Sequence, residues 1–178
     1  MKIGWFFMLM SAILLRMQAS AQTFNPNEWV GSYEGTMNLS SANGNQTVQI
    51  AFTFQEVKTD SVWTYTMKYM RPGQEDLVKD YRIVRQSKVS FVLDEQDGIL
   101  IDLPYRNDAF LSIFEVDGMV HCSSMSKSEY GIRLELFGAD IDRPSRTSQS
   151  VDEKSQAFSV NSFAPSYAQT VQLKKKKK

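Results

Sequence analysis

The sequence predicts an all-β fold, an antiparallel up-and-down β-barrel of eight to ten strands. Two observations carry this prediction. Between Trp29 and about Gly138, apolar side chains recur at every second residue, the period of a strand with one buried face. The runs are short and separated by turn residues, and no stretch after the first 21 residues shows a normal-length helix. Because a long meander leaves two unpaired edges unless it closes, we expect a barrel, with an open two-sheet sandwich as the alternative.

The alternation is clearest in four runs. Residues 48–54, 89–94 and 132–136 each alternate apolar with polar or small side chains. In the fourth run, one face of the expected strand carries Trp63, Tyr65, Met67 and Tyr69. The dense β-branched and aromatic residues are typical of strands.

Turn chemistry separates the runs. Asn43-Gly44-Asn45, Asp97-Gly98 and Asp117-Gly118 contain residues that tolerate positive φ and suit tight hairpins. Arg71-Pro72-Gly73 predicts the start of a longer loop.

The stretch WVGSYEG predicts the first strand. Gly31 and Gly35 lie two residues to either side of Tyr33, on its face of the strand. Glycine inside a strand marks a bend or the close approach of another backbone, as barrel closure requires. We expect Trp29 to plug one end of the barrel. Residues 98–103 and 109–116 are apolar on both faces, which fits a packed end, a dimer surface or a covered patch.

The Trp29-x-Gly31-x-Tyr33-x-Gly35 pattern resembles the first strand of the calycin-type barrels, which include lipocalins and fatty-acid-binding proteins. Residues 94–99, 110–116 and 134–136 are also similar to a group of uncharacterised exported bacterial lipocalin-like proteins. The resemblance covers roughly residues 29–138 and implies a barrel that binds a small apolar molecule. The sequence departs from lipocalins because it lacks their usual disulfide and a clear C-terminal helix.

The N-terminus predicts export. Lys2 precedes an apolar run at residues 3–15, and Ala19-Ser20-Ala21 offers a signal-peptidase site before Gln22. The run is shorter than the ~20 residues of a spanning helix, although a retained anchor is the rival interpretation. Cys122 is the only cysteine, so no internal disulfide forms, which suits a bacterial periplasmic or extracellular protein.

We therefore expect three parts: a signal peptide at residues 1–21, a barrel domain at residues 22–138 and a tail at residues 139–178. The tail is polar, contains Pro144 and lacks either period, so it is predicted to be mostly disordered. Residues 22–173 hold 13 Lys and Arg against 20 Asp and Glu, which disfavours nucleic-acid binding. The closing lysines are interpreted as a solvated terminus or as a weak contact to an anionic surface, and they are Lys174, Lys175, Lys176, Lys177 and Lys178.

The sequence predicts a ligand-binding interior rather than a catalytic site. The residues expected to line it are Tyr33, Trp63, Tyr65, Met67, Tyr69 and Phe91. Apolar pockets and apolar cores share composition, so a filled core is the alternative, and with it a ligand-free envelope or interaction module.

Other candidate groups are weaker. His121 is the only histidine, so no multi-histidine zinc site forms, and adjacent His121 and Cys122 point to opposite faces of a strand. A haem-ligand role for His121 is a further alternative. Arg82 or Arg85 would clamp a ligand carboxylate if it faced inward, but a solvated outer face is favoured. The acidic residues around Asp94 and Asp97 lack the EF-hand spacing and suit a hairpin turn. We predict no enzyme activity, no metal and no cofactor.

Overall fold

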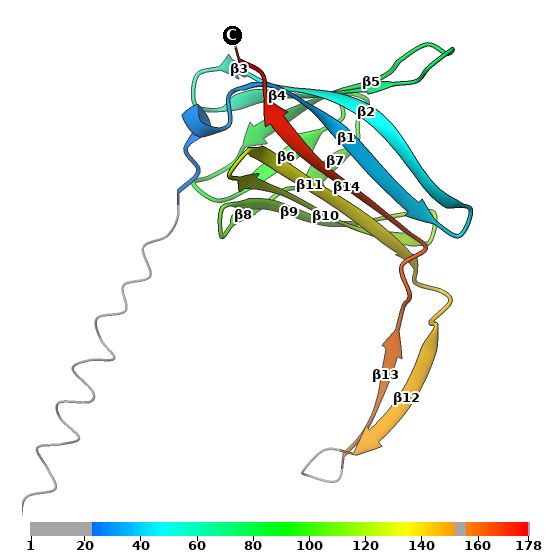
Figure 1. The fold of residues 1–178 in the computed structure, drawn as a ribbon. Helices are drawn as coiled ribbons and strands as arrows, with labels where there is room; N and C mark the ends of the chain where they lie inside the picture. Colours follow the sequence, from blue (N-terminus) through cyan, green and yellow to red (C-terminus); the bar gives the residue numbers. More distant parts are fainter. Residues whose placement is uncertain (1–22, 152–155, 178) are drawn as a thin grey trace, which may run out of the picture.

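A computed structural model describes residues 23–151 and 156–177 of the chain. Figure 1 shows one strongly curved antiparallel sheet and a separate two-stranded arm that extends away from it. The predicted signal peptide at residues 1–21 lies outside the described residues. Within the described residues the only helix is a 3-10 turn, η1 (Pro26–Glu28). None of the described helices is therefore long and apolar enough to cross a membrane.

The main sheet contains 12 strands, of which 11 follow one another in the order β7-β6-β5-β4-β2-β1-β14-β11-β10-β9-β8, while β3 pairs with β4. The bounds are β1 (Gly31–Ser41), β2 (Gly44–Phe54), β3 (Glu56–Lys58), β4 (Val62–Met70), β5 (Leu77–Arg85), β6 (Phe91–Asp94), β7 (Leu100–Asp102), β8 (Tyr105–Arg106), β9 (Ala109–Val116), β10 (Met119–Ser128), β11 (Gly131–Asp140), β12 (Arg146–Val151), β13 (Ala157–Ser162) and β14 (Tyr167–Lys175). The predicted all-β, antiparallel, barrel-like fold is confirmed. The predicted count of eight to ten strands is too low.

The prediction of a mostly disordered tail is wrong. β14 lies between β1 and β11 and pairs antiparallel with both, so the tail supplies a central strand of the sheet. Val171 and Leu173 are 2% and 0% exposed, respectively. The short alternation of residues 167–173 is diluted by alanine, glutamine and threonine, which hid the strand from a search for apolar periodicity.

The sheet forms a half-barrel. Its backbone hydrogen bonding continues around the whole circumference only at one end. β7 and β8, the two ends of the strand order, are separated only by Leu103 and Pro104. The Leu103 amide donates to the Phe91 carbonyl, and the Leu111 amide donates to the Pro104 carbonyl. Between β7 and the later part of β9, no ladder is present among the described strands. The expected complete cylinder is therefore replaced by a half-barrel with an unpaired seam.

The predicted turns are confirmed. Asp117 and Gly118 both have positive φ, 49° and 76°, and they join β9 to β10 as a two-residue hairpin. Positive φ at both positions is what the type I′ turn requires. Gly44 has φ 102° in the hairpin between β1 and β2. The loop after Met70 runs six residues before β5 begins at Leu77.

Gly35 marks the place where β14 crowds the first strand. A side chain at Gly35 would collide with the carbonyl oxygen of Gln172 and the Val171 side chain. The predicted close approach of another backbone is thus present, and the neighbouring strand is β14.

Aromatic side chains fill one end of the half-barrel, which we call the plugged end. Phe24, which precedes the first strand, contacts six other rings there at centroid distances of 5.1–6.3 Å. The predicted plug Trp29 is 0% exposed and belongs to this cluster. The other rings in contact with Phe24 are Phe54, Trp63, Phe91, Tyr105 and Phe110.

The arm consists of β12 and β13, which pair only with each other. All of its described strand residues are exposed, including the apolar side chains of Val151, Phe158 and Val160. Its two ends meet at the half-barrel, where Gly138 pairs with Tyr167. The arm is thus an insertion between two strands that are already neighbours (Figure 1).

We expect the half-barrel to fold without the arm. Replacing residues 141–164 with Asn-Gly would join β11 to β14 by a short connection of four residues, Asn-Gly followed by Pro165 and Ser166. Because the arm contributes no ladder to the main sheet, the free energy of unfolding in urea should change by only about 1 kcal/mol or less. A loss of cooperative unfolding would show instead that the arm supports the half-barrel.

Candidate ligand-binding cavity

A cavity of about 230 Å³ lies inside the half-barrel, beyond the plugged end. Its wall is mostly apolar and comes from strands all around the sheet. The apolar lining residues are Met37, Met67, Leu93, Ile101, Leu103, Phe114, Met125, Leu134 and Leu136. The large rings that contact Phe24 lie at the plugged end, whereas the cavity is lined by methionine, leucine and isoleucine together with tyrosine and Phe114.

Three of the six predicted ligand-binding residues line this cavity. Tyr65, Met67 and Tyr69 project into it from β4, where they alternate with outward-facing Thr66 and Lys68. The inward face of β4 was thus correctly identified from its period of two.

The other three predicted residues lie in the packed core instead. Trp63 and Phe91 are fully buried and belong to the plugged end. Tyr33 is 2% exposed, and its hydroxyl donates to the Trp29 carbonyl at 2.6 Å. These residues share the inward face, but their level along the barrel axis places them away from the cavity lining.

Three tyrosines make one wall of the cavity. Tyr65 and Tyr81 are stacked, with centroids 6.3 Å apart, on neighbouring β4 and β5. Burial raises the pKa of Tyr65, and the nearby Tyr69 and Tyr81 hydroxyls raise it further. Burial also raises the pKa of Tyr69. For Tyr81, burial is again the main cause of a raised pKa, followed by its hydrogen bond to Glu95. Burial is therefore the main cause of the raised pKa at all three tyrosines of this wall.

The polar residues on the other walls were not among the predicted ligand-binding residues. Ser112 and Ser123 face each other across β9 and β10, and their hydroxyl oxygens are 2.6 Å apart. Lys79 and Glu95 flank Tyr81, and Gln169 contributes from β14. Strand parity places each of them on an inward face, but only the order of strands in the sheet shows that they share one cavity.

The cavity also borders the unpaired seam. Ile101 and Leu103 line it from one side of the seam, and Ser112 and Phe114 line it from the other. On the outside of the seam, Leu100 and Ile113 are 67% and 76% exposed. The runs at residues 98–103 and 109–116, which are apolar on both faces, thus have a packed inner face and an exposed outer face in the single chain.

His121 lies on the inner face near the cavity, whereas Cys122 lies on the outer face. Nδ1 of His121 is 2.5 Å from the Tyr167 hydroxyl, and the imidazole stacks on Phe114 at 5.0 Å between centroids. Cys122 pairs with outward-facing Ile113 and Phe137. The two adjacent side chains therefore do not meet.

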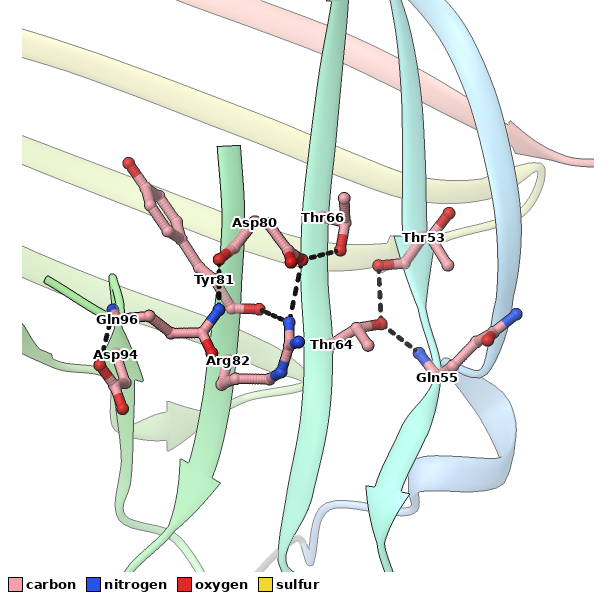
Figure 2. A network of polar contacts seen from close by, with 9 residues as sticks. All are labelled: Thr53, Gln55, Thr64, Thr66, Asp80, Tyr81, Arg82, Asp94 and Gln96. Carbon is pink, nitrogen blue, oxygen red and sulfur yellow. Dashed lines mark hydrogen bonds and ion pairs between the residues drawn. The ribbon is translucent and has the colours of Figure 1, made fainter. Parts of the chain in front are cut away.

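Arg82 is on the outer face, as the favoured interpretation held. Figure 2 shows its guanidinium meeting Asp80, which also accepts a hydrogen bond from the Thr66 hydroxyl. The hydrogen bond from Thr66, followed by that from Arg82, holds the pKa of Asp80 below its usual range. Arg82 is thus not available as an inward clamp for a ligand carboxylate.

Arg85 faces inward but at the plugged end. Its guanidinium lies over the rings of Phe24, Trp63 and Phe91 at 5.2–5.7 Å, and it forms an ion pair with Asp60 at 2.6 Å. Such a cation over several aromatic faces is attracted by the ring quadrupoles. Arg85 therefore covers the plug and does not reach the cavity lining.

The acidic turn behaves as a hairpin turn. The Asp94 carboxylate accepts from the Gln96 amide at 2.8 Å, and the Asp97 carboxylate accepts from the Ile99 amide at 3.1 Å. Across residues 23–151 and 156–177, no group of three or more His, Cys, Asp or Glu side chains is placed to hold a metal ion.

Comparisons with protein-family models, with curated proteins and with solved structures found no match to this chain.

Proposed function

We propose that this chain is an exported, lipocalin-like protein that binds a small apolar or amphipathic molecule inside the half-barrel. The observation that supports the proposal is the apolar cavity of about 230 Å³ beside the tyrosine wall. Binding sites for small molecules are concave, mostly apolar and carry a few placed polar groups. The cavity combines these features, and nothing in the proposal requires chemistry on the ligand.

The export part of the proposal rests on the sequence. Cleavage after Ala21 would leave Phe24 as the third residue of the mature chain, directly before the plugged end that it completes. Export to the periplasm or the cell exterior is also consistent with a fold that uses no disulfide and holds its one cysteine unpaired.

Ligand binding can be tested by filling the cavity. We expect purified protein to bind small apolar alcohols in calorimetry and Met67→Trp to abolish binding, because the indole would occupy the cavity. Lys68→Trp is the matched control, since its side chain leaves the same strand on the outer face and should preserve binding. Circular dichroism checks that each variant is folded, and Leu103→Phe is a milder filling variant. Equal binding by both tryptophan variants would reject the cavity as the site.

A second candidate is a ligand-free interaction module. It is favoured by the exposed apolar side chains on the seam, Leu100 and Ile113, and on the arm, Phe158 and Val160. The closing lysines add a weak attraction to anionic surfaces, although Lys174 and Lys175 belong to β14 and Lys176 is ion-paired with Glu34 at 2.7 Å. This candidate predicts no calorimetric signal with apolar ligands and a self-associating or surface-bound protein.

A further inference from the structure

The ionisable side chains that face the cavity cancel in charge. Lys79 and Glu95 both lie beside Tyr81, the first with its ammonium 5.9 Å from the ring centroid and the second as the hydrogen-bond partner of the hydroxyl. Glu135 contributes to the lining, but its carboxylate is bonded to Arg133 at 2.8 Å on the outer side of β11. The lining thus contains the cation Lys79 and the anion Glu95 beside one tyrosine, and a second anion, Glu135, that is ion-paired with Arg133.

This balance matters because a ligand that enters the cavity gives up part of its contact with water. A charged group that leaves water needs an opposite charge or several hydrogen bonds in exchange, and without them its burial is strongly unfavourable. A ligand carboxylate near Tyr81 would be attracted by Lys79 and repelled by Glu95, and a ligand amine would be repelled by Lys79 and attracted by Glu95. Neither ion gains a net attraction from this site.

The remaining polar groups of the lining are uncharged, and apart from the Gln169 amide they are hydroxyls. Ser112 is 6% exposed, and its hydroxyl and that of Ser123 form one hydrogen bond with each other. Two hydroxyls carry two donor hydrogens, so one of them is left over, and neither hydroxyl has another hydrogen bond within the described part of the chain. The hydroxyl of Tyr65 on the opposite wall has no hydrogen-bond partner there either. These groups suit a neutral oxygen on the ligand.

The size of the cavity limits the rest of the ligand. At about 230 Å³ it is smaller than the ~300–1,000 Å³ that drug-sized molecules occupy. Its walls of methionine and leucine are adaptable and match a short chain or a small ring.

From these observations we propose that the ligand is an uncharged molecule with a small apolar body and a hydroxyl or carbonyl oxygen. The cavity selects against carboxylates and amines of the same length. This inference rests on the proposed function and narrows it to one chemical class.

The test compares three ligands that share one chain: 1-octanol, octanoate and octylammonium, measured by calorimetry at pH 7.5. We expect octanol to bind at least about tenfold more tightly than either ion, the difference that 1.4 kcal/mol produces. Glu95→Gln should tighten octanoate binding about tenfold relative to octanol binding, because it removes the repelling charge. Asp102→Asn removes the same charge from the exposed outer side of β7 and should leave the octanol-to-octanoate ratio as it was.

A double variant tests the role of the two serine hydroxyls. Ser112→Ala combined with Ser123→Ala removes both oxygens together, so no buried hydroxyl is left without its partner. We expect octanol to bind about fivefold to tenfold more weakly, with no loss of folded protein by circular dichroism.

The outcomes separate the two proposals. Tighter binding of octanoate than of octanol by the unaltered protein would overturn the neutral-ligand inference and leave the proposed function standing. An octanol-to-octanoate ratio that ignores Glu95→Gln would overturn it as well. If none of the three compounds bound, the proposed function would fall and this inference with it.

Discussion

Phe24→Ala should lower the free energy of unfolding by about 3–5 kcal/mol, the range for truncation of a buried phenylalanine. Phe24 is 5% exposed, and its ring contacts six others at the plugged end. The surrounding rings come from different strands, so they cannot collapse together into the space that the ring leaves. In a domain of this size the thermal midpoint would fall by roughly 10 °C, and urea unfolding followed by tryptophan fluorescence measures the free-energy change.

The arm offers a matched control. Phe158→Ala removes the same ring from an exposed position, 47% accessible, so its effect should stay within about 0.5 kcal/mol. Phe24→Leu should fall between the two alanine variants because it keeps part of the apolar volume. If Phe24→Ala cost no more than Phe158→Ala, the segment before β1 would not be docked in the plugged end in solution.

Removal of residues 167–178 should abolish cooperative folding. This truncation deletes β14, which pairs with β1 on one side and with β11 on the other. It would leave two facing strands with unpaired main-chain groups and would remove buried Val171 and Leu173 from the core. Unsatisfied buried amides and carbonyls are as costly as the lost apolar contacts. We expect no sigmoidal urea transition and a loss of the near-ultraviolet circular dichroism of the packed aromatic rings.

Deletion of Lys177 and Lys178 alone is the control for this truncation. It keeps β14 and the hydrogen bond from the Lys176 amide to the Ser32 carbonyl, so stability should change little. A truncated chain that still unfolded cooperatively near the original midpoint would show that β1 and β11 can pair directly without β14.

Much of the fold could be predicted because strands and tight turns are recognised from residues that are close together in the sequence. The alternation from Trp63 to Tyr69 correctly assigned β4 and its inward face. Asp117-Gly118 correctly assigned a tight hairpin, because few residues other than glycine, asparagine and aspartate accept positive φ. Each of these features depends on neighbours a few residues away.

The wrong predictions concern features that depend on interactions between distant parts of the chain. Tyr167–Lys175 forms a strand because β1 and β11 supply partners on both sides, not because its own pattern is strongly apolar. The same limit affected the candidate site. Trp63 and Tyr65 share one face of one strand, yet the first lies in the plug and the second in the cavity wall. Their levels are set by which rings converge from other strands.

The sequence by itself determined that the chain folds as antiparallel strands with one apolar face, since period and turn residues are local properties of the backbone. The tertiary structure alone decided that β14 completes the sheet, that the seam beside β7 stays unpaired and that a cavity remains above the aromatic plug. The physical reason is that register and strand order fix which side chains share a level of the interior, and the space left there depends on all of their volumes together.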